Sequence, residues 1–124
     1  MVEDFHRAFG LGVQDEFANV PKDIAQLRFN LLDEENKEYL EACLENDTTE
    51  IADAIGDMLY IILGTALAHG FQDKIEEVFA EIQRSNMSKL GEDGKPIYRE
   101  DGKVLKGPNY FKPNIEAILE KEQV

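Results

Sequence analysis

The chain has 124 residues, which suits one domain, and 43% of them are hydrophobic, which argues against a disordered chain. It carries 13 Lys and Arg against 26 Asp and Glu, and the formal net charge of −13 disfavours nucleic acid and anionic membranes as partners. A free anion would also be repelled unless metal cations lie between it and the protein. The single cysteine, Cys43, excludes an internal disulfide, so we expect a reduced, cytoplasmic protein.

Apolar residues at helical spacing predict an all-α fold. The predicted helices span residues 2–10, 21–44, 47–70, 72–90 and 113–121. Pro21 suits the first turn of the second of these helices. Asp47 suits the N-cap of the third, with Glu50 in the capping-box position, and Gly70 suits its end.

The segment from Met58 to Ala68 is apolar or small at nearly every position. A helix of this kind should be covered on several sides. The segment is too short to cross a membrane, and the acidic N-terminus lacks the apolar region of a secretory signal. In a domain of this size, the pattern predicts a helix at a bundle centre or at an interface between subunits.

The C-terminal part differs in character. Two short segments, 96–99 and 103–106, flank Glu100-Asp101-Gly102, a pattern that predicts a small β-hairpin. Its lysines and arginines form a basic strip, although lysines are also common on solvated edge strands. We therefore predict a four- to five-helix bundle in one domain, residues 1–124, with residues 92–112 as a hairpin and tail extension.

Two groups of carboxylates stand out in the middle of the chain. The first is Glu34, Glu35 and Glu38, and the second is Glu50, Asp53 and Asp57. Spacings of three, four and seven residues place each group on one helical face. A short loop predicts that the two helices are antiparallel neighbours, so that the faces oppose each other across a groove. Oxygen donors without His or Cys suit Mg²⁺, with Mn²⁺ as a substitute.

Each group also has an ordinary structural explanation. Glu34, Glu35 and Glu38 could form a solvated helix face. Glu50 could serve only as a capping residue, and Asp53 is favoured near a helix N-terminus by the helix dipole. Asp57 fits such explanations less well, because it lies beside an apolar segment where an unpaired carboxylate is costly.

A second cluster of polar residues ends the fourth predicted helix. Arg84, Asn86 and Lys89 carry hydrogen-bond donors that suit phosphate oxygens, with Arg84 the weakest candidate. The alternative is ordinary capping of a helix C-terminus by cations, which the helix dipole favours.

Three motifs in this order resemble the all-α nucleoside triphosphate pyrophosphohydrolases. They are E-E-N-K-E at 34–38, E-I-A-D at 50–53 and S-N-M-S-K at 85–89. This superfamily includes MazG-like proteins, dimeric dUTPases and phosphoribosyl-ATP pyrophosphatase. The resemblance covers about residues 20–90, and the tail at 94–108 is similar to that of MazG-like members.

The resemblance implies a homodimer or homotetramer that cleaves a nucleoside triphosphate between the α- and β-phosphates, using Mg²⁺ and releasing a nucleoside monophosphate and pyrophosphate. Within the same class, the alternative is phosphoribosyl-ATP pyrophosphatase of histidine biosynthesis. An alternative of another class is a non-catalytic helical interaction module with an acidic face.

Carried over by motif, the resemblance also implies roles for individual residues. The metal ligands would be Glu35, Glu38, Glu50 and Asp53, and Glu34 would be a ligand or the group that orients and deprotonates the attacking water. Some relatives place the motif aspartate directly before an L-L-Y-like run, which here makes Asp57 a further acid of the site. The substrate phosphates would be held by Asn86 and Lys89.

Overall fold

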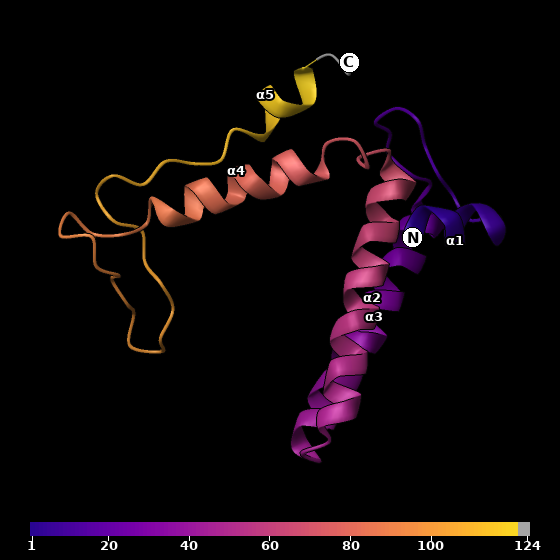
Figure 1. The fold of residues 1–124 in the computed structure, drawn as a ribbon, viewed down its shortest axis with the longest axis horizontal. Helices are drawn as coiled ribbons and strands as arrows, with labels where there is room; N and C mark the ends of the chain where they lie inside the picture. The colour runs from indigo at the N-terminus through magenta and orange to yellow at the C-terminus, as the bar shows by residue number, and fades with distance from the viewer. Residues whose placement is uncertain (122–124) are drawn as a thin grey trace. The chain divides into compact units, whose positions relative to one another are not determined.

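The computed structural model describes residues 1–121 of the chain (Figure 1). Its internal contacts separate two units, Met1–Gln72 and the chain from Asp73 onward. The first unit holds α1 (Val2–Ala8), α2 (Lys22–Leu44) and α3 (Thr48–His69). The second holds α4 (Ile75–Met87) and α5 (Ile115–Glu120). The prediction of an all-α fold is confirmed, whereas the prediction of a single domain stays a prediction.

In the first unit, α2 and α3 lie side by side as an antiparallel pair (Figure 1). The turn between them is short because Asn46 adopts a left-handed conformation (φ 56°) and Asp47 begins the next helix at once. The Asp47 side chain accepts a hydrogen bond from the backbone N–H of Glu50 at 3.1 Å, which confirms the predicted N-cap. Because the turn is short, the acidic faces of α2 and α3 belong to the same unit.

The far end of α3 is tied to the loop that follows α1. The backbone N–H groups of Gln14 and Ala18 donate to the carbonyl oxygens of Leu67 and His69, each at 3.0 Å. Gly70 ends α3 in a left-handed conformation (φ 79°), as predicted. The loop passes so close to Gly70 that a side chain at this position would overlap the backbone carbonyl of Glu16.

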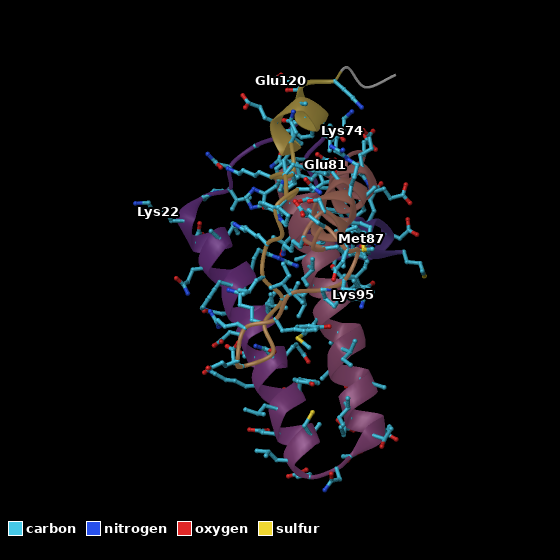
Figure 2. All side chains as sticks on the ribbon, turned by 90° about the vertical axis from the view of Figure 1, so that its left-hand side faces the viewer. Lys22, Lys74, Glu81, Met87, Lys95 and Glu120 are labelled. Atoms are coloured by element: carbon cyan, nitrogen blue, oxygen red, sulfur yellow. The ribbon has the colours of Figure 1, made fainter. Side chains whose placement is uncertain are left out.

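In the second unit, the tail folds back along α4. The Ser85 hydroxyl donates to the backbone oxygen of Phe111 at 2.8 Å, and the Phe111 N–H donates to the Ser88 hydroxyl at 3.1 Å. Glu81, labelled with Met87 along α4 in Figure 2, accepts from the Asn114 N–H at 2.7 Å. These bonds hold the segment before α5 against α4.

The predicted β-hairpin at 96–106 is wrong. Within residues 1–121 this segment forms only one isolated antiparallel bridge, between Tyr98 and Val104, and no strand. Isolated two-stranded hairpins are only marginally stable in water. Tyr98 is 62% exposed and Val104 45% exposed, so little packing is available to stabilise a longer ladder.

The first unit buries few large side chains. The core residues of α3 are mostly small, whereas many large apolar side chains of α2 and α3 are exposed: Leu27, Phe29, Leu40, Leu44, Ile55, Leu59 and Ile62. By length and composition alone, α3 is also apolar enough to cross a membrane. Its first half, however, carries three carboxylates, which are costly in lipid.

Candidate active site

The two acidic faces meet across the seam between α2 and α3. Glu35 of α2 shows this most clearly, because its pKa is raised to about 7. Burial is the largest cause, followed by the neighbouring Glu38 carboxyl and by repulsion from Asp57 and Asp53 of α3. The structure therefore brings four of the six predicted acids into one cluster, here called the Glu35 cluster.

One oxygen in this cluster has no partner. Glu35 Oε2 is buried and accepts no hydrogen bond from any described residue. A buried, unsatisfied carboxylate oxygen is costly, and either a proton or a bound cation can relieve the cost. Because the pKa of Glu35 is raised to about 7, a proton can relieve part of this cost near neutral pH.

A groove of about 130 Å³ continues the cluster toward the α2–α3 turn. It is lined by Glu38, Glu41, Ala42, Glu45, Glu50, Asp53 and Ala54. The sequence reasoning missed Glu41 and Glu45. Their spacing of three and seven residues from Glu38 places them on its helical face, so the signal was present in the pattern.

Glu50 lines this groove with a carboxylate that takes part in no hydrogen bond among residues 1–121. Only half of the expected capping box is formed, since Asp47 caps the Glu50 N–H but the Glu50 side chain returns no bond. Its carboxylate therefore stays available to a ligand in the groove.

Glu34 and Asp57 lie at different depths. Glu34 is exposed on α2 and does not line the groove, so its role as base stays a prediction. Asp57 is half-buried and raises the pKa of Glu35, as Asp53 does. Both motif aspartates thus act on Glu35, Asp57 more strongly than Asp53, whereas Asp53 and not Asp57 lines the groove.

The carboxylates fit a divalent cation by their chemistry. They offer only oxygen donors, as Mg²⁺ prefers, and one of those oxygens is buried without a partner. In residues 1–121 no three Asp, Glu, His or Cys side chains already converge closely enough to hold a metal ion. Binding would therefore require the carboxylates to rotate inward, which a cation favours and their mutual repulsion opposes.

The predicted phosphate-binding residues belong to the second unit. Arg84 is already engaged, because its Nε donates to Glu81 at 2.8 Å and its guanidinium stacks on the Phe111 ring. This ion pair lowers the pKa of Glu81. Asn86 is exposed and Lys89 is half-buried, and in the described part of the chain neither side chain forms a hydrogen bond or an ion pair.

The family model described as phosphoribosyl-ATP pyrophosphohydrolase matches residues 2–86, more than half of the chain. An uncharacterised protein, L479, of Acanthamoeba polyphaga mimivirus is 36% identical over 73 residues, which cover 56% of this chain but only 29% of that protein. The crystal structure of a candidate NTP pyrophosphohydrolase from Exiguobacterium sp. 255-15 is 27% identical, with a TM-score of 0.47, and the match covers 96% of this chain and 89% of that one.

Proposed function

Because the chain belongs to the phosphoribosyl-ATP pyrophosphohydrolase family, we propose that it is a Mg²⁺-dependent nucleoside triphosphate pyrophosphohydrolase. The proposed reaction breaks the anhydride bond between the α- and β-phosphates. Water supplies the new P–O bond, and the products are a nucleoside monophosphate and pyrophosphate. The observation that carries this proposal is the buried, unpartnered oxygen of Glu35 opposite the aspartates of α3.

The proposed metal site lies between α2 and α3. Glu35 and Glu38 of α2 and Asp53 and Asp57 of α3 would hold Mg²⁺, with Glu50 at the groove end. A bound Mg²⁺ neutralises phosphate charge and lowers the pKa of a coordinated water. This also accounts for how a protein with a net charge of −13 binds a polyanion.

The remaining residues act by position and proton transfer. In the proposal, Glu34 accepts the proton of the attacking water, because its exposed carboxylate is free to do so. Asn86 and Lys89 of the second unit donate to the substrate phosphates, because their side chains form no hydrogen bond or ion pair with any described residue. Arg84 is a weaker candidate, because Glu81 and Phe111 already hold it in place.

The decisive test is a nucleotide panel scored for pyrophosphate release with and without Mg²⁺. Glu38→Gln and Asp53→Asn should each abolish turnover while circular dichroism shows the fold intact. Asp23→Asn, an exposed acid in the first turn of α2, is the matched control and should retain full activity. Activity retained in both site variants would refute the assignment of the site.

Phosphoribosyl-ATP is the second candidate substrate, favoured by the description of the matching family. Pyrophosphate release from phosphoribosyl-ATP but not from any nucleoside triphosphate would establish it in place of the first. A non-catalytic interaction module would instead show no saturable Mg²⁺ binding, and its stability would be unchanged or raised when Glu38 or Asp53 is neutralised.

We also propose a cytoplasmic homodimer or homotetramer. Leu40 of α2 is 57% exposed and Leu59 of α3 is 58% exposed, and a second copy could cover both. Light scattering after size exclusion should give a molar mass that is a multiple of 14.1 kDa, and Leu59→Asp should lower that mass. A monomer of the unaltered chain at micromolar concentration would refute this.

A further inference from the structure

Arg28 of α2 lies between α2 and α3, and within residues 1–121 it has no carboxylate partner. Its Nη2 donates to the backbone oxygen of Ile61 at 2.7 Å, and its Nε donates to the Thr65 hydroxyl at 3.0 Å. Both bonds cross to α3. No carboxylate of residues 1–121 lies within 4.0 Å of it, although four acids cluster on the same seam. Its charge is thus directed to neutral acceptors of the opposite helix.

The position of these bonds connects them to the Glu35 cluster. Arg28 precedes Glu35 by seven residues on α2, or about 10 Å along the helix, and both share one face. Ile61 follows Asp57 by four residues on α3, about one turn away. The Arg28 bonds therefore cross the same seam, about two turns along α2 from Glu35 and about one turn along α3 from Asp57.

The guanidinium has little freedom to move. A Cβ atom built on Gly64 would lie 2.6 Å from Arg28 Nη2 and 2.5 Å from His6 Nε2, so both side chains pack on the bare backbone of Gly64. His6 is itself buried, and its Nδ1 bonds to the backbone oxygen of Gly12 at 3.1 Å. Packing against His6 and Gly64 locks the direction in which Arg28 can donate.

We propose that Arg28 is a positioning residue, which ties α3 to α2 and so sets the separation at which the opposed carboxylates bind the metal. Carboxylates of α2 and α3 line one groove across this seam, and like charges repel each other when no cation lies between them. Hydrogen bonds from a charged donor are stronger than neutral ones, and a fork of two nitrogens can hold two acceptors together. The inference rests on the metal site of the proposed function but not on the identity of the substrate.

The test is Mg²⁺ binding measured by calorimetry in the absence of nucleotide. Arg28→Lys keeps the charge but loses the planar fork of two nitrogens. Thr65→Val removes a hydroxyl that accepts from Arg28 Nε and itself donates to the backbone oxygen of Ile61 at 3.0 Å. By analogy with other residues that position metal ligands, we expect Mg²⁺ binding to weaken by about tenfold in Arg28→Lys, and by less in Thr65→Val. Arg7→Lys, an exposed arginine paired with Glu3 in the same unit, is the control and should bind Mg²⁺ as the unaltered chain does.

A second measurement separates positioning from substrate contact. If Arg28 only positions the carboxylates, saturating Mg²⁺ should restore most of the kcat of Arg28→Lys, and the nucleotide KM measured at saturating Mg²⁺ should stay near that of the unaltered chain. Unchanged Mg²⁺ affinity in folded Arg28→Lys would overturn the inference, whatever the KM does.

The outcomes also distinguish this inference from the proposed function. An unaltered chain that binds Mg²⁺ but hydrolyses no nucleotide would refute the activity and leave the Arg28 inference to be decided by the binding data. An unaltered chain that binds no Mg²⁺ would refute both.

Discussion

Replacing Glu35 by glutamine should stabilise the metal-free protein at alkaline pH. The structure holds the Glu35 carboxyl at a pKa of about 7, above its ordinary 4.5, because it is buried near three other acids. An acid with a raised pKa in the folded state stabilises the fold while it is protonated. That contribution is complete below pH 4.5 and is lost as the pH rises through 7.

The size of the effect follows from the shift. Each pKa unit corresponds to about 1.4 kcal/mol, so a shift of about 2.5 units sets an upper limit of about 3.4 kcal/mol. Glu35 is only half-buried, and solvent screening reduces this to about 1–2 kcal/mol. Glutamine keeps the shape and never carries the charge, so Glu35→Gln should gain this amount at pH 8 and nothing near pH 4.5.

The assay is urea unfolding in EDTA at pH 4.5, 6 and 8, at equal protein concentrations because association also stabilises the fold. Adding Mg²⁺ at pH 8 should reverse the order, because the unaltered chain gains metal binding that Glu35→Gln lacks. A variant that is less stable than the unaltered chain at pH 8 in EDTA would refute the reasoning. So would a difference that does not depend on pH.

Other predictions concern the framework around the site. Asp47→Ala removes the cap on the Glu50 N–H and should cost about 1 kcal/mol in thermal unfolding, whereas Asp47→Asn should cost much less. Gly70→Ala should cost at least about 1 kcal/mol in the same assay, because the left-handed backbone disfavours alanine and its Cβ would overlap Glu16; an unchanged melting temperature would contradict this. Ser88→Ala should leave the Phe111 N–H without the hydroxyl to which it donates. Hydrogen exchange should then be faster at Phe111 while the amides of α4 stay protected.

The helices of this protein could be predicted from local pattern. Apolar spacing, Pro21, Asp47 and Gly70 located the helices of the first unit, because helix periodicity and capping depend on residues a few positions apart. The same locality explains why the two acidic faces were predicted correctly as facing groups: a three-residue turn leaves antiparallel packing as the simplest arrangement.

Features that depend on distant residues could not be predicted in this way. The hairpin at 96–106 failed as a prediction because its turn signal is local but its stability requires packing that the tail does not supply. Ser85 and Ser88 stand in the sequence only as members of the S-N-M-S-K motif, whereas in the structure they hold Phe111, more than 20 residues away.

The sequence by itself determined the helical class and the two opposed rows of acids, since both follow from spacing along single helices. Only the tertiary structure decided which acids affect one another's ionisation. Burial and repulsion across the seam raise the pKa of Glu35, and its Oε2 has no hydrogen-bond partner among the described residues. It also decided that Arg28, which no motif marks, bonds to α3 beside them. A pKa and a cross-helix hydrogen bond depend on distances in space, and sequence separation alone does not set those distances.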